Sequence, residues 1–423
     1  MDINPDTEAA VRVRHPWLTF HVDLGNMAPK FWMLLGEARS KADHLSMVPV
    51  PKAYAETLHR VELAKGVHAT TAIEGNTLTA SQVLERMEGQ LHVEPSQEYQ
   101  VREVDNVLAA YNGILADILA GTPPALSSEA ICQFNRTILE GLPREDHVTP
   151  GEIRTDPVTV GGGIYTPPNA AHCRYLLDRL CDWLNGPAFE QRGDMRIPVA
   201  LIKASLAHLY LAWIHPFGDG NGRTARCIEF LVLITSGVPT SAAHLISNHC
   251  NQTRSEYYRE LRVASASGGD VSSFLSYCLQ GFVGGMTEQL KMVYGHQFEL
   301  AWSEVVRQRV DGRDLEMVTR RRRLAETMLR ANTPIAKSEL ASLNAELARA
   351  YARRGAKTLT RDVNELVNLG LLVQDEDGRV RARREELFSL LPLAIPEGGA
   401  RELELAFVDQ PQISPDQLSL PLV

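Results

Sequence analysis

The stretch HPFGDGNGRTAR, residues 215–226, decides the architecture of this chain. One apolar run with helical spacing, 204–214, leads into it, and a second, 224–234, leads out. The stretch is therefore expected to be a short loop between two helices. It holds a histidine, an acid, a glycine-rich turn and two arginines, which are the residue types that chemistry on a phosphate group needs.

The glycine-rich turn predicts an anion site. Gly220 and Gly222 flank Asn221, and glycine permits positive φ and close backbone approach, so that successive N–H groups can point into one concavity. The helix that is expected to start near Asn221 adds its own unpaired N–H groups and the positive end of its dipole. Asp219 stands at the lip, where a carboxylate can hold Mg²⁺ against phosphate oxygens.

The remaining side chains of the stretch fit group transfer. Arg223 and Arg226 are three residues apart and share a helix face, where two guanidinium groups can clamp phosphates. His215 precedes the turn, and its near-neutral pKa suits the acceptance of a hydroxyl proton. Phe217 is expected to point inward. The simpler alternative is a structural turn with Asp219 as a helix cap and solvated arginines, but the conjunction at fixed spacing favours a site.

This segment resembles the signature of the Fic family, His-x-Phe-x-Asp/Glu-Gly-Asn-Gly-Arg-x-x-Arg, and every fixed position is met. The resemblance covers roughly residues 65–280. It implies a mainly α-helical protein, a Fic-type helical bundle with a small β-hairpin flap, that transfers AMP from ATP to a hydroxyl group of a target protein. The intact Gly-Asn-Gly-Arg form favours AMP over other nucleotides.

The resemblance also implies roles for the residues of the loop. His215 would be the general base and Asp219 the Mg²⁺ ligand. Arg223 would stabilise the diphosphate leaving group, and Arg226 would meet the γ-phosphate. The residues that would hold the α- and β-phosphates are Gly220, Asn221 and Gly222.

A second segment, about 157–167, predicts a β-hairpin. Short β-prone runs surround three consecutive glycines, and a Pro-Pro pair ends the segment. Alone in a helical protein, such a hairpin has an unpaired edge, and it resembles the Fic flap, whose edge takes up the target segment as an added strand. The alternative is an ordinary surface hairpin. The residues expected to dock the target are Val160, Gly163, Ile164 and Tyr165.

Tyr257 and Tyr258 also resemble the family, in which a tyrosine pair lines the adenine end of the site. Consecutive residues of a helix point in different directions, so at most one ring is expected to stack on the base. Core packing is the alternative for both.

Residues 70–76, TTAIEGN, resemble the inhibitory motif of Fic proteins, Ser/Thr-x-x-x-Glu-Gly/Asn. Gly75 supplies a helix stop, so Glu74 is expected near the end of a short helix, about 66–76. A carboxylate there is unfavourable for the helix dipole and needs a cationic partner, for which Arg226 is the candidate. The pair would place Glu74 where the γ-phosphate belongs and inhibit the chain in cis. The alternative is a solvated acid.

Composition bounds the class of protein. The chain has 423 residues, of which 44% are hydrophobic and 22% are charged, values that are typical of globular proteins. Its net charge of −9 argues against non-specific binding of nucleic acid. No run of 18 apolar residues occurs, so no membrane contact is expected. The N-terminus lacks a secretory signal pattern, and the six cysteines are widely spaced. A reducing cytoplasm with buried free thiols is expected.

The C-terminal part differs in charge and pattern. Residues 301–390 hold 18 Lys+Arg against 14 Asp+Glu. A helical run at 324–330, a turn and helix start at 333–340, and an amphipathic helix at 359–370 are followed by a hairpin pattern over 371–381 with a turn at Asp377-Gly378. This order resembles a winged helix (α+β). Contact with DNA and contact with a protein are equally expected, because Asp362, Glu365 and the acidic turn tip dilute the basic patch, and winged helices also serve as protein-binding modules.

These patterns predict a domain organisation. A helical region carrying the inhibitory segment would span 1–110, the Fic core 111–285, a connecting helix 286–315 and a winged-helix-like domain 316–395, with a flexible tail over 396–423. The connecting helix is expected to break near Gly284-Gly285. The expected partners are ATP, a target protein and a second copy of the chain. Two alternatives use the same site: removal of AMP from a modified protein, and a winged-helix regulator whose Fic core only senses the nucleotide.

Overall fold

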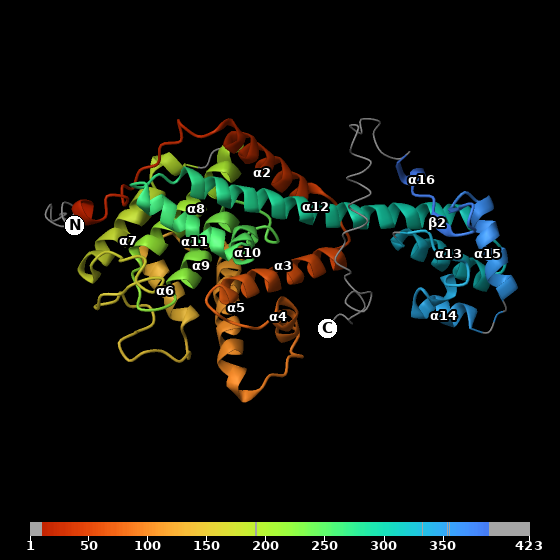
Figure 1. The fold of residues 1–423 in the computed structure, drawn as a ribbon, viewed down its shortest axis with the longest axis horizontal. Coiled ribbons are helices and arrows are strands. Elements are labelled where there is room, and N and C mark those ends of the chain that lie inside the picture. Colours follow the sequence, from red (N-terminus) through yellow and green to blue (C-terminus); the bar gives the residue numbers. More distant parts are fainter. Residues whose placement is uncertain (1–10, 191–192, 332, 353, 355, 389–423) are drawn as a thin grey trace. The chain divides into compact units, whose positions relative to one another are not determined.

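The computed structural model describes residues 11–190, 193–331, 333–352, 354 and 356–388. The chain divides into two compact units, Met1–Thr287 and Glu288–Val423, which Figure 1 colours from red to blue along the sequence. The tail expected at 396–423 lies outside the described residues. The mainly helical class is confirmed.

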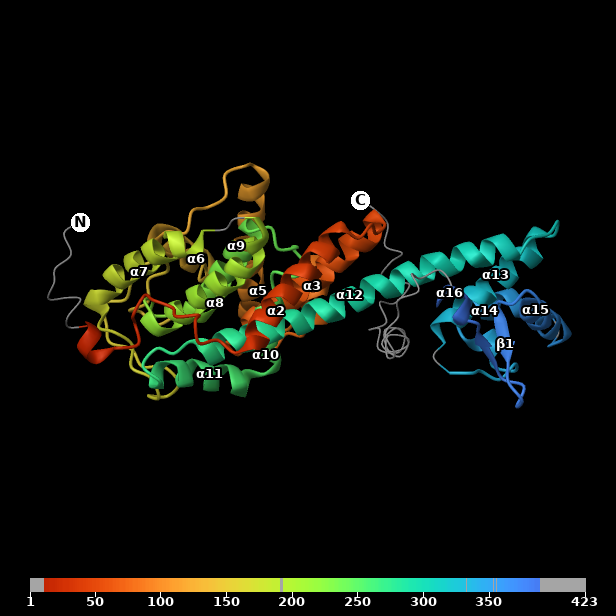
Figure 2. The same cartoon turned by 90° about the horizontal axis from the view of Figure 1, so that it is seen from above.

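The first unit is helical almost throughout (Figures 1 and 2). Its helices before the loop stretch are α2 (Pro29–Met47), α3 (Lys52–Ala72), α4 (Ala80–Met87), α5 (Glu98–Leu119), α6 (Ser128–Ile138), α7 (Ala170–Leu184) and α8 (Arg196–Ile214). Those after it are α9 (Asn221–Thr235), α10 (Leu245–Gln252), α11 (Arg254–Ala266) and the start of α12 (Ser272–Arg309). Short 3₁₀ turns lie at Pro95–Gln97, Pro187–Phe189 and Gly193–Met195.

Helix α8 forms the centre of this unit. It packs against α2, α7 and α9, and nearly all of its side chains are buried, because it is apolar on every face. Among the described residues, Gly193–Ile214 is the one helical segment long and apolar enough to cross a membrane, and 83% of its most apolar window is buried inside the protein. Burial on that scale is typical of a core helix.

The loop between α8 and α9 forms where the sequence predicts it. Helix α8 ends because His215 adopts the left-handed conformation (φ 47°, ψ 59°) and Pro216 follows. Helix α9 begins at Asn221 directly after Gly220, which has φ 77°. The prediction of an inward Phe217 is confirmed, since the ring is 1% exposed.

The helix before Glu74 is longer than expected. The inhibitory helix expected over about 66–76 is part of α3, which begins at Lys52 and ends at Ala72. Its first residue has no side-chain cap, which is why the sequence pattern gives no start signal. Glu74 therefore lies in the turn after the helix, and Gly75 completes that turn with φ 104°.

The expected break in α12 is wrong, because the helix runs from Ser272 to Arg309 without interruption. Its glycines serve close packing on α10 instead. A Cβ at Gly281 would lie 2.3 Å from the His249 ring, and one at Gly285 would lie 2.5 Å from Leu245. Helix–helix approach at this distance outweighs the roughly 1 kcal/mol cost of a glycine in a helix.

The second unit contains the remainder of α12, then α13 (Leu315–Arg330), a 3₁₀ turn (Leu340–Ser342), α14 (Ala345–Tyr351), α15 (Ala356–Asn368), β1 (Leu372–Gln374), β2 (Val380–Ala382) and α16 (Glu385–Phe388). The predicted hairpin is confirmed, with β1 and β2 antiparallel and Val373 opposite Arg381. Ile335 adds a bridge to Val380 on the other side of β2. Trp302 and Leu324 lie in the core of this unit.

A buried polar cluster joins three helices of the second unit, α13, α14 and α15. Asp362 on α15 is fully buried and accepts hydrogen bonds from Nε of Arg320 at 2.7 Å and Nε of Arg321 at 2.9 Å. Tyr351 donates a third bond to it. Asp362 therefore does not dilute the basic surface of α15, and the first two arginines of the 320–323 run are core residues.

Candidate active site

His215 lies at the C-terminus of α8 in a strained backbone conformation. A left-handed conformation costs a non-glycine residue roughly 1–2 kcal/mol. Arg154 holds that conformation, because its Nε donates to the His215 carbonyl at 2.8 Å and its backbone N–H donates to the Pro216 carbonyl at 2.9 Å. Burial lowers the pKa of His215 to about 4. The imidazole is therefore neutral near pH 7 and can accept a proton.

Asn221 fixes the shape of the loop. Its Oδ1 accepts from the backbone N–H of Phe217 at 3.0 Å, and its Nδ2 donates to the carbonyl of the same residue at 2.8 Å. Both ends of the amide are thus used within the loop. The Asn221 side chain therefore helps to shape the loop, and its expected contact with phosphate stays a prediction.

Asp219 and Arg223 are paired at the mouth of the loop. Nη2 of Arg223 donates to Oδ1 of Asp219 at 2.9 Å, and the Asp219 side chain is 47% exposed. Nη1 of Arg223 donates to Oε1 of Glu103 on α5 at 2.6 Å. Arg223 is therefore held between two carboxylates with its guanidinium almost fully buried.

The predicted contact between Glu74 and Arg226 is present. Nη2 of Arg226 donates to Oε1 of Glu74 at 2.5 Å and to the Thr70 carbonyl at 2.9 Å. Burial alone would raise the pKa of Glu74, but the charge and hydrogen bond of Arg226 outweigh it and lower that pKa. Glu74 Oε1 lies 2.2 Å from the point where a Cβ at position 222 would stand, so it reaches the helix start because residue 222 is glycine.

Arg226 has donors to spare. Its side chain is buried, and its Nε and Nη1 have no hydrogen-bond partner among the described residues. A buried cation with unpaired donors is costly unless an anion completes it. The arrangement therefore fits a guanidinium that binds phosphate oxygens once Glu74 moves away.

The two tyrosines separate as expected for neighbours on a helix. Tyr257 is buried, and its hydroxyl lies 2.8 Å from Nε2 of His208, whose Nδ1 contacts Glu229 at 2.8 Å. Tyr258 is 52% exposed, and its pKa is raised by partial burial and then by the charge of Glu74, against the effect of Arg226. Tyr257 therefore belongs to the core, and of the two rings only Tyr258 is exposed, so the expected stacking on a base stays a prediction for Tyr258.

The expected flap is a tight hairpin. Val160 and Tyr165 exchange two backbone hydrogen bonds, of 2.9 and 3.2 Å, around the three glycines. Ile164 at the tip is 72% exposed. The Tyr165 hydroxyl donates to the Trp213 carbonyl at 2.7 Å, which anchors the hairpin to the end of α8.

Three residues that the motif does not contain complete the site: Glu103, Asn135 and Arg154. Asn135 Nδ2 donates to the Asp219 carbonyl at 2.9 Å, and its Oδ1 accepts from Gly151 N–H at 2.9 Å. Glu103 and Asn135 come from α5 and α6, distant in sequence. The sequence signal available for them is a charged or amide residue on an otherwise apolar helix face.

Comparisons with known proteins agree with this geometry. Residues 125–233 match the Fic/DOC family model. The protein adenylyltransferase fic-1 of Caenorhabditis elegans is 31% identical over 227 residues, which are 52% of this chain and 41% of that protein. The protein adenylyltransferase Fic of Drosophila ananassae is 30% identical over 238 residues, 56% of this chain and 44% of that protein. This chain thus spans less than half the length of these curated relatives.

Solved structures show the same fold. A Fic family protein from Desulfovibrio desulfuricans matches with a TM-score of 0.52 at 19% identity, covering 86% of this chain and 98% of its own. Residues 134–508 of Fic-1 from C. elegans match with a TM-score of 0.51 at 24% identity, covering 68% and 78%.

The helical fold places a glycine-rich loop, the N-terminus of α9 and a neutral histidine side by side. The match of residues 125–233 to the Fic/DOC family model agrees with that arrangement, and it includes residues 215–226, which carry the resemblance seen in the sequence.

Proposed function

We propose that this protein transfers AMP from ATP to a hydroxyl side chain of a target protein. The observation that carries the proposal is the loop itself, where the neutral His215 stands beside a helix N-terminus and two buried arginines. His215 would remove the proton of the attacking hydroxyl, which bonds to the α-phosphorus as the bond to the diphosphate breaks. Arg223 would stabilise the negative charge that develops on the leaving diphosphate.

The loop also fits Mg²⁺. Oδ1 of Asp219 accepts from Arg223 and from the Gly220 N–H, whereas no hydrogen bond is recorded for its Oδ2, and the side chain is half exposed. The described residues contain no cluster of three or more Cys, His, Asp or Glu that could hold a metal by themselves. Asp219 would hold the ion together with phosphate oxygens and water, and the ion would supply charge to the diphosphate.

We also infer that Glu74 inhibits the chain in cis. Its carboxylate forms the ion pair with Arg226 at 2.5 Å and approaches Gly222 at the start of α9. A γ-phosphate bound at the proposed position would be a second anion, beside the Glu74 carboxylate, on the guanidinium of Arg226. ATP would bind with its α-phosphate displaced, and displacement by about an ångström can lower a rate on the order of a hundredfold.

The experiment is incubation of wild-type, Glu74→Gly, His215→Ala and Glu74→Gly/His215→Ala protein with Mg²⁺ and α-labelled ATP, followed by measurement of label transfer and intact mass. We expect self-labelling in the Glu74 variant, weak labelling in wild type and none when His215→Ala is added to Glu74→Gly. Glu85→Gly, an exposed acid on α4, is the matched control and should resemble wild type.

The outcomes separate the candidate functions. No label in any variant would overturn AMP transfer. Release of AMP from a labelled protein by the wild type, lost in Glu74→Gly, would instead support AMP removal. Nucleotide binding that survives His215→Ala without any transfer would support a sensor.

A second candidate function concerns the C-terminal unit, which we propose to be a winged-helix contact module. Asp362 is buried, so it does not add its charge to the solvent side of α15. The side chains on that side are mostly basic or amide and line a shallow hollow: Lys357, Thr360, Arg361, Asn364, Glu365 and Asn368. Such a face fits the major groove of DNA. Arg361→Glu should abolish duplex binding in a mobility-shift assay if DNA is the partner. A homodimer and a cytoplasmic location stay predictions.

A further inference from the structure

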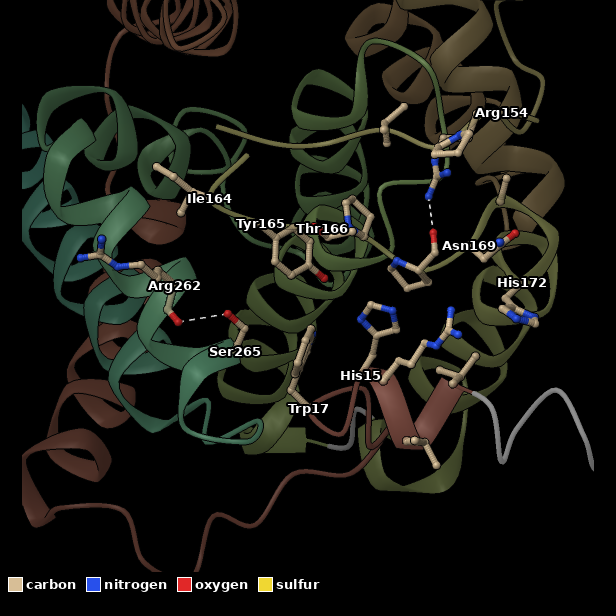
Figure 3. A pocket seen from close by; sticks show the side chains of 18 of the residues that line it. His15, Trp17, Arg154, Ile164, Tyr165, Thr166, Asn169, His172, Arg262 and Ser265 are labelled. Atoms are coloured by element: carbon tan, nitrogen blue, oxygen red, sulfur yellow. Dashed lines mark hydrogen bonds between the residues drawn. The ribbon is translucent and has the colours of Figure 1, made fainter. Parts of the chain in front are cut away.

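A large groove lies beside the flap, in the first unit. Its volume is about 1190 Å³, and its walls come from the N-terminal segment 11–17, the flap and the start of α7, and α11. Figure 3 shows Ile164 and Arg262 at one end of this groove and His15 and His172 toward the other. The candidate active-site loop does not line it, so it is a separate surface.

Among the described residues, the charged side chains that line this groove are all basic. Three arginines and two histidines line it, and no aspartate or glutamate is among its described lining residues, although the chain as a whole carries a net charge of −9. Among the described residues, Arg14 and Arg262 form no ion pair with an acidic side chain. The pKa of His15 is lowered by burial and then by the charges of Arg14 and His172, which places these basic groups close together.

The middle of the groove is apolar. The Trp17 and Tyr165 rings lie there with centroids 6.1 Å apart, and Val158 and Pro167 line the same space. An anion alone would leave the apolar middle of the groove exposed to water. A segment with an apolar side chain between acidic residues would cover both the apolar middle and the basic ends.

The wall of the groove is connected to the catalytic histidine. The guanidinium group of Arg154 donates hydrogen bonds to three backbone carbonyls, those of His215, Asp156 and Pro168. The Tyr165 hydroxyl is bonded to the carbonyl of Trp213, two residues before His215. A chain segment seated in the groove is thus held against the same backbone that carries the proton acceptor.

We propose that this groove binds an extended segment of the target protein in which an apolar residue is flanked by acidic residues. The charges of Arg14 and Arg262 and the apolar middle select that segment, and the flap places its neighbouring hydroxyl residue toward His215. This inference rests on the proposed AMP transfer, whose target class it names.

The test uses three fluorescent peptides that share a serine and a central leucine. The leucine is flanked by aspartates in the first, by asparagines in the second and by lysines in the third. Binding is measured by anisotropy without nucleotide, so the result does not depend on AMP transfer. We expect the aspartate peptide to bind about tenfold more tightly than the asparagine peptide and the lysine peptide to bind least.

Charge reversal supplies the control. Arg14→Glu combined with Arg262→Glu should remove the preference for the aspartate peptide, whereas Lys30→Glu, a reversal at an exposed position of α2 outside the groove, should keep it. Leu→Ser in the aspartate peptide should weaken binding as well. Equal binding of the three peptides, or a preference that survives the double reversal, would overturn the proposal and leave the groove to another occupant, such as a terminus of the chain.

Labelling in the Glu74→Gly background separates this inference from the proposed function. Transfer to the asparagine and aspartate peptides at equal rates would support AMP transfer and overturn the acidic target. Selective binding of the aspartate peptide without any transfer would support the groove and overturn the activity.

Discussion

Nδ2 of Asn76 donates a 2.8 Å hydrogen bond to Oε2 of Glu103, whose Oε1 accepts from Arg223 at 2.6 Å. The turn that carries Glu74 is therefore joined to both arginines of the loop, to Arg226 directly and to Arg223 through Glu103. Displacement of this turn by a nucleotide would change the surroundings of both cations together.

Glu103→Gln tests this connection. Burial raises the pKa of Glu103, although Arg223 and Asn76 act in the opposite direction. The carboxylate of Glu103 is one of the two that pair with the positive charge of Arg223. We expect the variant to unfold on the order of 2 kcal/mol more easily, because a buried cation loses one of its two partners. ATP should restore the loss, since its phosphates replace the missing charge.

The measurement is the melting temperature with and without ATP. The rise produced by ATP should be larger in Glu103→Gln than in wild type. Glu98→Gln, an exposed substitution on the same helix, should show the wild-type rise. An equal rise in all three proteins would show that Glu103 does not set the charge at Arg223.

Gly222→Ala should disturb both the inhibitory contact and the nucleotide site. The new Cβ would lie 2.2 Å from Oε1 of Glu74, and the flexible carboxylate would move away from Arg226. The same Cβ would occupy part of the space proposed for the γ-phosphate, because Glu74 stands in that space. Residue 222 is helical, so alanine suits its backbone. We expect Gly222→Ala added to Glu74→Gly to lower self-labelling about tenfold relative to Glu74→Gly alone. Equal labelling of the single Glu74→Gly variant and the double variant would argue against a steric role for this glycine.

Asn135→Ala should loosen the loop. The amide is fully buried and serves Asp219, Thr224 and Gly151, so its loss leaves buried polar groups without partners at about 1–3 kcal/mol each. We expect a loss of about 3 kcal/mol in urea unfolding together with reduced labelling in the Glu74→Gly background. The comparison is Asn26→Ala, an exposed amide whose Nδ2 donates to Asp23, which should change the unfolding free energy little.

The loop and its partner could be predicted because their information is local. Residues 215–226 hold their geometry in one continuous stretch, and Glu74 belongs to a second short motif, so the pair with Arg226 followed from two patterns. Glu103 and Asn135 could not be predicted, because periodicity assigns a residue to a helix face but does not say which helix that face meets. The start of α3 was missed because no capping side chain marks it.

The break expected in α12 shows the same limit. Glycine is favoured both where a helix ends and where two helices approach closely. Only the position of His249 and Leu245 against Gly281 and Gly285 decides between these roles. That contact is tertiary, and the local pattern does not contain it.

Asp362→Asn should destabilise the second unit. Arg320 and Arg321 would be left buried without their carboxylate, a change that costs about 3–5 kcal/mol. Burial raises the pKa of Asp362, but hydrogen bonds from both arginines outweigh burial and lower it. A lowered folded-state pKa means that the stabilisation is present above the unfolded pKa of about 3.9 and is lost as pH falls below it.

Hydrogen exchange of peptides from α13 and α15 provides the measurement, because it reports on this unit alone. Protection in wild type should exceed that in Asp362→Asn by a constant amount from pH 7 to about pH 5, and the difference should shrink at lower pH. Asp375→Asn, in the exposed hairpin turn, is the control. A difference that grows as pH falls would contradict the assigned direction of the pKa shift.

Tyr258→Ala and Tyr257→Phe should separate nucleotide contact from core packing. The exposed Tyr258 ring stands near Glu74 and Arg226, and an aromatic stack on a base contributes about 1 kcal/mol, so its removal should weaken ATP binding about fivefold with little change in stability. Tyr257→Phe removes the hydroxyl that His208 contacts and should lower the unfolding free energy by about 1–2 kcal/mol while ATP binding is retained. Calorimetric titration of ATP in the Glu74→Gly background, paired with urea unfolding, measures both quantities. The reverse pattern, in which Tyr257→Phe weakens ATP binding and Tyr258→Ala does not, would place the base against the buried tyrosine.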